Sequence, residues 1–209
     1  MSLPDFGPRD FRAATGVSRE TLERLELFAD RLRQWQTQLN LVAESTMPEL
    51  WHRHFYDSAQ LDELAPKEAQ KWLDFGSGAG FPGLVIAILR ARPGFEMHLT
   101  DRLARKCDFL REIAQSLGLP VTVHQGKIEA LQPLSADVLS ARACAPLPKL
   151  LEFFEIHAAP GATALFAKGR SLPEELTEAK RTWRLAYDSL PSRTGSGGQI
   201  LRLRSAVRA

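Results

Sequence analysis

Hydrophobic positions divide the chain into two regions with different periodicities. Over residues 18–42 the apolar side chains recur at steps of three and four, which predicts one face of a long amphipathic helix. Ser18 stands before this run in the position of a helix N-cap. A shorter helix is expected over about residues 47–64. We therefore predict that residues 1–70 form a helical extension, whose apolar face packs against the rest of the protein.

From residue 71 onward, short apolar runs alternate with helical patterns. The runs predict five successive strands at 71–75, 96–101, 120–125, 137–141 and 161–168. Alternating strands and helices predict a parallel sheet with helices on both faces. Two more strands, 184–190 and 199–204, have only a short glycine-rich link between them, so they must be antiparallel. The predicted fold class is therefore α/β, with a mostly parallel sheet and one antiparallel strand near the C-terminus, over residues 71–209.

Composition narrows the possible classes of protein. No run of 18 apolar residues and no secretory signal pattern occurs, so we expect a cytoplasmic protein without a membrane span. Cys107 and Cys144 match no metal-binding or redox spacing, and no metal site is expected. The formal net charge is +2, but residues 71–209 carry 19 Lys and Arg against 13 Asp and Glu. This imbalance favours nucleic acid weakly, because most surface charges are simply solvated.

The segment from residue 71 to residue 83, KWLDFGSGAGFPG, combines a strand, a glycine-rich turn and the start of a helix. Glycines permit left-handed backbone and close approach of a ligand, and a helix N-terminus offers unpaired N–H groups. Such a turn at the carboxyl end of a parallel strand is where open α/β sheets bind nucleotide-like ligands. Residues 78–83 also match the dinucleotide fingerprint G-x-G-x-x-G, which on its own is a weak signal.

Two acidic residues favour S-adenosylmethionine (SAM) over a dinucleotide. Asp74 precedes the turn, where a carboxylate would repel a pyrophosphate but suits the cationic end of SAM. Asp101 ends the next strand, 25 residues beyond Gly76, where it can bind both ribose hydroxyls. This order of acid, turn, helix, strand and acid is typical of Rossmann-like, class I SAM-dependent methyltransferases. A dinucleotide-dependent oxidoreductase is the alternative.

Several short motifs together resemble one family. They are RHFYDS at 53–58, LDFGSGAGFPG at 73–83, DRLARK at 101–106, SARA at 140–143 and KG at 168–169. Their order and content closely resemble the bacterial 16S ribosomal RNA (guanine-N7) methyltransferases, also called the glucose-inhibited division protein B family. The resemblance extends over about residues 22–203 and implies that the cofactor is SAM and the substrate a guanine of 16S rRNA.

The resemblance also implies the cofactor-binding residues. With Asp74 from the preceding argument, the predicted set is Asp74, Gly76, Gly78, Phe81, Asp101, Ile128, Glu129 and Arg142. One position departs from the family, which usually has arginine where this chain has Lys127. The positive charge is retained, but the planar guanidinium that binds phosphate with two parallel bonds is lost.

The predicted chemistry needs no general base, because guanine N7 carries a lone pair and no proton. Arginine and lysine bind the N7 and O6 edge of guanine. Arg142 and Lys168 follow successive strands, and we predict that one or both position the substrate, although Lys168 could instead pair with a carboxylate. Asp57 is expected to pair with Arg53, four residues earlier on the same helical face.

Other classes of function remain open at this point. The chain could be a non-catalytic RNA-binding or ribosome-assembly protein, or a methyltransferase of proteins or small molecules. A net charge of +2 predicts weak binding of naked RNA at physiological salt, since phosphate contacts dominate such affinity. We therefore expect a monomer that acts on 16S rRNA within a small-subunit ribonucleoprotein particle.

Overall fold

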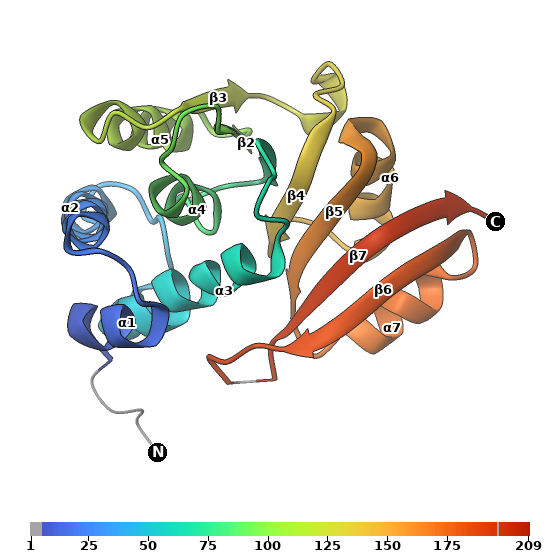
Figure 1. The fold of residues 1–209 in the computed structure, drawn as a ribbon, viewed down its shortest axis with the longest axis horizontal. Coiled ribbons are helices and arrows are strands. Elements are labelled where there is room, and N and C mark those ends of the chain that lie inside the picture. The colour runs from blue at the N-terminus through green and yellow to red at the C-terminus, as the bar shows by residue number, and fades with distance from the viewer. Residues whose placement is uncertain (1–5, 196) are drawn as a thin grey trace.

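A single seven-stranded sheet organises the protein in the computed structural model, which describes residues 6–195 and 197–209. The strand order is β3-β2-β1-β4-β5-β7-β6 (Figure 1). The strands are β1 (Lys71–Phe75), β2 (Glu96–Asp101), β3 (Val121–Gln125), β4 (Ala136–Arg142), β5 (Ala158–Lys168), β6 (Trp183–Pro191) and β7 (Gln199–Arg208). The first five are parallel, whereas β7 is antiparallel to both β5 and β6. The predicted fold, with one antiparallel strand, is confirmed.

Helices cover both faces of this sheet, and each face has its own hydrophobic cluster (Figure 1). On one face lie α4 (Gly83–Leu89) and α5 (Ala104–Ser116), and on the other lie α6 (Leu147–His157) and α7 (Leu172–Ala179). Successive residues of β1 alternate between the clusters, with Trp72 in the first and Leu73 in the second. Because β1 to β5 are parallel, their carboxyl ends lie along one edge of the sheet.

The N-terminal region is helical, as predicted, but it is more divided than the sequence suggested. Its helices are α1 (Pro8–Thr15), α2 (Arg19–Gln36), a 3₁₀ helix η1 (Glu44–Glu49), a π-helix η2 (Trp51–Tyr56) and α3 (Asp57–Leu64). The Ser18 hydroxyl caps α2 by accepting from the Thr21 N–H. The prediction that one helical face continues to residue 42 was wrong. The Gln36 side chain accepts from the N–H groups of Leu41 and Val42, so the chain turns after Gln36.

The N-terminal helices share one hydrophobic core with the sheet. Phe28 of α2 stacks on Phe81 beside the glycine turn, at 5.2 Å between ring centroids, and Phe55 of the π-helix meets Phe81 edge-on. All three rings are almost fully buried. This packing brings the motif at residues 53–58 to the carboxyl end of the sheet. Within the described residues, no helix is both long and apolar enough to cross a membrane.

Candidate active site

Two cavities lie at the carboxyl ends of the strands and meet at the loop between β4 and α6. The smaller cavity, of about 420 Å³, is lined by residues that follow β1, β2 and β3. The larger cavity, of about 700 Å³, is lined by parts of the π-helix, α3, the β4–α6 loop, the β5–α7 turn and the β6–β7 loop. Cys144 and Ala145 line both cavities, so this loop forms the wall between them.

The glycine turn forms one side of the smaller cavity. Gly76 has a φ of +61°, and a Cβ atom built there would lie 2.5 Å from Cys144 Sγ. A side chain would therefore collide with the wall between the cavities. The backbone N–H of Gly78 donates to one carboxylate oxygen of Asp101 at 3.0 Å, and the N–H of Leu103 donates to the other at 2.8 Å. These two bonds fix the Asp101 carboxylate at the rim of the smaller cavity.

Asp74 lies beneath the turn and lines neither of the two cavities. Its carboxylate is fully buried and accepts a 2.6 Å hydrogen bond from the Ser140 hydroxyl. Burial raises the pKa of Asp74 to about 6, against the opposing effect of the Ser140 hydrogen bond. A Cβ on Gly83 would meet this carboxylate at 2.8 Å. The structure thus brings Asp74 to the turn, but on its buried side, where Ser140 of β4 holds its carboxylate.

The far side of the smaller cavity comes from the segment after β3. Ile128 and Glu129 line it and begin the short 3₁₀ helix η3 (Ile128–Ala130). Glu129 pairs with Lys149 of α6 at 3.2 Å, and the Phe153 ring contributes an apolar surface. Lys127 lines a separate, smaller pocket of about 230 Å³ next to β3. Phe153 and Thr100 were missed by the sequence reasoning, although Thr100 directly precedes the predicted Asp101.

Phe81 also lies behind the cavities, and is only 3 % exposed. Its ring lies 5.2 Å from the Arg142 guanidinium, in a cation–π arrangement. The structure therefore sorts the predicted cofactor-binding residues into three groups. Those that line the smaller cavity are Gly76, Asp101, Ile128 and Glu129, the one that lines the larger cavity is Arg142, and those that line neither are Asp74, Gly78 and Phe81.

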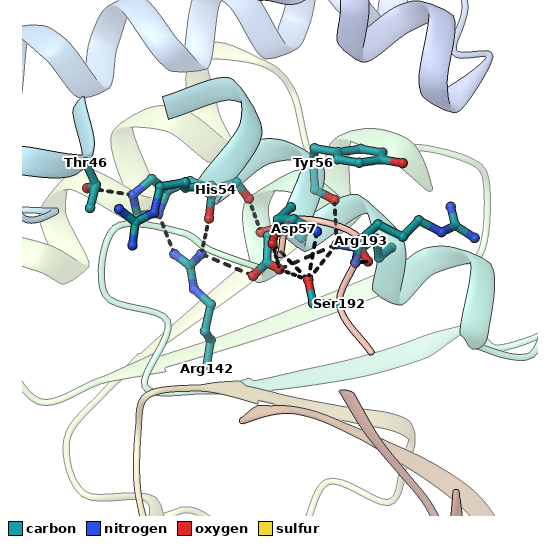
Figure 2. Close-up of polar contacts among 11 residues, drawn as sticks. Thr46, His54, Tyr56, Asp57, Arg142, Ser192 and Arg193 are labelled. Atoms are coloured by element: carbon teal, nitrogen blue, oxygen red, sulfur yellow. Dashed lines mark hydrogen bonds and ion pairs between the residues drawn. The ribbon is translucent and has the colours of Figure 1, made fainter. Parts of the chain in front are cut away.

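Arg142 ends β4 and is held from the N-terminal helices (Figure 2). Its guanidinium donates to the backbone carbonyl of Arg53 at 3.2 Å and to His54 Nδ1 at 2.9 Å. Because Nδ1 accepts, we assign the His54 proton to Nε2, which donates to the Thr46 hydroxyl at 2.8 Å. Burial, followed by the charges of Arg142 and Arg53, lowers the pKa of His54 to about 3. His54 is therefore neutral at physiological pH.

The predicted pairing of Asp57 with Arg53 was wrong. Arg53 pairs with Glu49 instead, at 3.5 Å. Asp57 lies 3.7 Å from the Arg142 guanidinium and accepts hydrogen bonds from the hydroxyls of Ser192 and Thr194 (Figure 2). The Asp57 carboxylate is engaged by Arg142 and by the hydroxyls of the β6–β7 loop, partners far away in the sequence that helical spacing does not predict.

Lys168 reaches the wall of the larger cavity, but its ammonium group is already paired. It donates to the carbonyl of Ala145 at 3.1 Å and forms a 2.6 Å ion pair with Glu175. Glu175 also accepts from the backbone N–H of Leu147, at 2.6 Å. The side chain of Lys168 is only 9 % exposed. Lys168 and Glu175 thus tie down the α6 end of the loop that separates the two cavities, and Glu175 was not anticipated from the sequence.

That loop has an unusual backbone conformation. Ala143 has a φ of +50°, which few residues other than glycine adopt and which costs about 1 kcal/mol or more. Next to it, burial and then the Asp74 and Asp101 carboxylates raise the pKa of the Cys144 thiol to about 11. Cys144 is therefore a neutral thiol at physiological pH, and is unsuited to nucleophilic attack.

Comparison with known sequences identifies the family. The sequence model described as "GidB: rRNA small subunit methyltransferase G" matches residues 21–198. This chain belongs to that family. Its relatives include the ribosomal RNA small subunit methyltransferase G of Paramagnetospirillum magneticum, which is 48% identical over 97% of this chain and 98% of its own length. The protein of the same name from Parvibaculum lavamentivorans is 49% identical over 93% of this chain and 87% of its own length.

Solved structures confirm the Rossmann-like methyltransferase fold. An O-methyltransferase from Bacillus cereus, solved in complex with SAH, superimposes with a TM-score of 0.62 at 14% identity, covering 95% of this chain and 96% of its own. A SAM-dependent methyltransferase from Aquifex aeolicus gives a TM-score of 0.58 at 16% identity, over 85% and 98% of the two chains. Both similarities concern the fold alone, while the family membership rests on sequence.

Proposed function

We propose that this protein transfers the methyl group of SAM to N7 of a guanine in 16S rRNA of the small ribosomal subunit. The observation that carries the proposal is the pair of cavities that meet at Cys144 and Ala145. One cavity suits a nucleoside cofactor, and the adjoining one has room for a second reactant. Membership of the rRNA small subunit methyltransferase G family supports the choice of RNA.

The residues of the smaller cavity fit SAM. The fixed Asp101 carboxylate has lone pairs free for the ribose hydroxyls beyond its two backbone hydrogen bonds. Ile128 and Phe153 offer apolar surface for the adenine ring, and Glu129 stands beside them. Gly76 keeps the turn free of a side chain where the cofactor must pass close to the backbone. SAM would supply an electrophilic methyl group bonded to its sulfonium sulfur. After transfer of the methyl group, the rest of the cofactor would leave as a neutral thioether.

In the larger cavity the protein's task is placement. Guanine N7 already carries the attacking lone pair, so a neutral His54 and a protonated Cys144 are compatible with the reaction. Arg142 is the residue we assign to holding the substrate edge or the cofactor's carboxylate. Lys168 acts on the wall between the cavities through Ala145. Well-oriented reactants can gain roughly 7–11 kcal/mol from such positioning.

The target guanine must be accessible, and the enzyme must be held on its RNA. A base inside a helix is inaccessible, so the target guanine must leave its stack or lie in a loop to enter the larger cavity. With a net charge of +2, the protein would bind naked RNA weakly at physiological salt. We therefore propose that an assembled small-subunit particle supplies further contacts, and that a monomeric enzyme acts on it in the cytoplasm.

Methyl transfer from labelled SAM tests the proposal. The substrates are small subunits from cells that lack this protein, with naked 16S rRNA and wild-type subunits as controls. We expect label on the deficient subunits, mapped to one guanine by N7-specific strand scission, and none on wild-type subunits. SAM binding without label on any RNA would contradict the RNA substrate and return the choice to proteins and small molecules.

A further inference from the structure

Asp57 touches two walls of the larger cavity that both lie far from it in the sequence. It begins α3, and its side chain is 17 % exposed. Its Oδ1 atom accepts from the Ser192 hydroxyl at 2.8 Å and from the Thr194 hydroxyl at 3.0 Å, both on the β6–β7 loop. Its Oδ2 atom lies 3.7 Å from Nη1 of Arg142 at the end of β4 (Figure 2).

On the basis of the proposed methyl transfer, we propose that Asp57 is a positioning residue for the substrate cavity. It fixes the position of the Arg142 guanidinium relative to the β6–β7 loop, so that both can contact the RNA base at the same time. The residue acts through Arg142 and the loop and has no chemical step of its own. The RHFYDS motif thereby acquires a role at the site, although it lies outside the strand–turn–helix pattern that binds the cofactor.

The two carboxylate oxygens have separate tasks. Both loop hydroxyls bond to Oδ1, whereas Arg142 approaches Oδ2. A hydroxyl can donate to a neutral amide oxygen and also to a carboxylate, but the ion pair with a guanidinium requires the negative charge. An asparagine at this position would keep the acceptor for the loop and lose the ion pair. Removal of the hydroxyls would do the opposite, so the two halves of the proposal are separable.

The remaining contacts of Arg142 explain why its position matters. A guanidinium has five N–H groups. In the described structure, those on Nη1 face the Arg53 carbonyl and Asp57, and one on Nη2 bonds to the neutral His54. The Nε–H and the second Nη2–H have no hydrogen-bond partner among the described residues. These two donors form one edge of the guanidinium, and the three protein acceptors determine where that edge points.

A purely structural role for Asp57 is the competing explanation, and the loop provides a control for it. Arg193 of the same loop forms a two-bond ion pair with Glu63 of α3, at 2.7 and 2.9 Å. Neither residue contacts Arg142. The hydrogen bonds of Asp57 and the Arg193–Glu63 ion pair both join α3 to the β6–β7 loop, so Glu63→Gln weakens the same attachment without touching the guanidinium.

The experiment compares four variants with the wild type in steady-state assays on deficient small subunits at varied concentration, with saturating SAM. Asp57→Asn should lower the methyl-transfer rate about 10- to 100-fold, because small misplacements of a reactant have effects of this size. Asp57→Glu, which keeps the charge, should recover part of that rate. The double variant Ser192→Ala/Thr194→Val should raise the KM for subunits several-fold with a smaller change in rate. Glu63→Gln should stay within about twofold of the wild type.

Two results would overturn the inference. The first is an Asp57→Asn rate within about twofold of the wild type, or a loss that Glu63→Gln reproduces. The second concerns an Arg142→Lys background, in which Asp57→Asn should cause little further loss because Asp57 acts through the guanidinium. A double variant whose loss equals the combined losses of the two single variants would contradict this. If Asp57→Asn does not fold, the Ser192/Thr194 variant decides, and an unchanged KM for subunits overturns the proposal. A wild-type protein that labels no RNA would instead contradict the proposed function.

Discussion

The two cavities differ in how they are assembled. The smaller cavity draws most of its lining from the ends of three successive strands and the turns after them, at residues 76, 100–103 and 126–129. The β4–α6 loop and α6 contribute the rest. The larger cavity collects residues from four segments between residue 53 and residue 200. A strand and its following turn are neighbours in the sequence, so the first site is visible there. The second exists only after the N-terminal helices and the last hairpin have packed together.

The cavities differ equally in how their charges are held. Asp101 is oriented by backbone N–H groups, so its charge stays available to a ligand. In the larger cavity the charges oppose one another: Arg142 faces Asp57, and Lys168 faces Glu175. Paired charges impose geometry with little net attraction for a polyanion. The larger cavity is therefore better suited to orienting one base than to capturing an RNA backbone, which agrees with recognition that depends on a larger particle.

Asp101→Ala should produce the largest effect and should be confined to the smaller cavity. Loss of two charge-assisted hydrogen bonds to the ribose would weaken binding by about 3 kcal/mol, or roughly 100-fold. Calorimetric titration with SAH measures this directly. Glu96→Gln is the control, because Glu96 lies at the opposite, exposed end of the same strand. An affinity within threefold of the wild type would remove Asp101 from the cofactor site.

Gly76→Ala tests whether the two cavities share a wall. The new methyl group would sit 2.5 Å from Cys144 Sγ, at a φ of +61°. We expect a loss of about 2 kcal/mol in the free energy of unfolding, partly from the left-handed backbone and partly from the collision. In a Cys144→Ala background the steric part should disappear and the backbone part remain. Equal losses in both backgrounds, measured by urea unfolding, would contradict the contact.

The sequence predicted the sheet correctly and singled out four residues that the structure places around the smaller cavity, for a physical reason. Strand periodicity, the glycine turn and the acid at the end of β2 are local signals, and the fold brings Gly76, Asp101, Ile128 and Glu129 around one space. The sequence located Asp74 at the turn, but the structure shows its side chain on the buried side of that turn. The Asp74 carboxylate accepts a hydrogen bond from Ser140 of the neighbouring strand β4. The local sequence pattern does not show which strand lies next to β1, so this contact could not be predicted.

The larger cavity was only partly predictable. Arg142 and Lys168 were expected at its mouth because they follow adjacent strands, and both line it. Their partners Asp57 and Glu175 lie 85 and 7 residues away in sequence. The helical spacing rule assigned Asp57 to Arg53, but in the structure Asp57 contacts Arg142 and Ser192, and Arg53 pairs with Glu49. Loop contacts such as Ser192 with Asp57 carry no periodic signal at all.

Lys168→Met and Glu175→Gln distinguish a substrate contact from a support of the wall. If the pair holds the loop, both variants should lower methyl transfer to a similar extent, on the order of tenfold, with little change in SAH affinity. Either change should also reduce stability by roughly 1–3 kcal/mol, since one member of a nearly buried pair loses its partner. If Lys168 instead touches the base, only Lys168→Met should abolish transfer. Parallel measurements of rate, SAH affinity and urea unfolding separate these outcomes.

His54→Asn should give the smallest effect at neutral pH, and its pH dependence reports on the larger cavity alone. The pKa of His54 is about 3 in the folded protein, against 6.5 normally, so the native state favours the neutral ring. That contribution to stability is present above pH 6.5 and is lost as the pH falls towards 3. The stability difference between wild type and variant should therefore shrink below pH 6.5, by at most about 1.4 kcal/mol per pH unit. Thr46→Val, which removes a hydrogen bond but keeps the ring, should retain the wild-type slope in urea unfolding between pH 7.5 and 4.5. Parallel curves for His54→Asn and the wild type would show that Arg142 is not held by a neutral histidine.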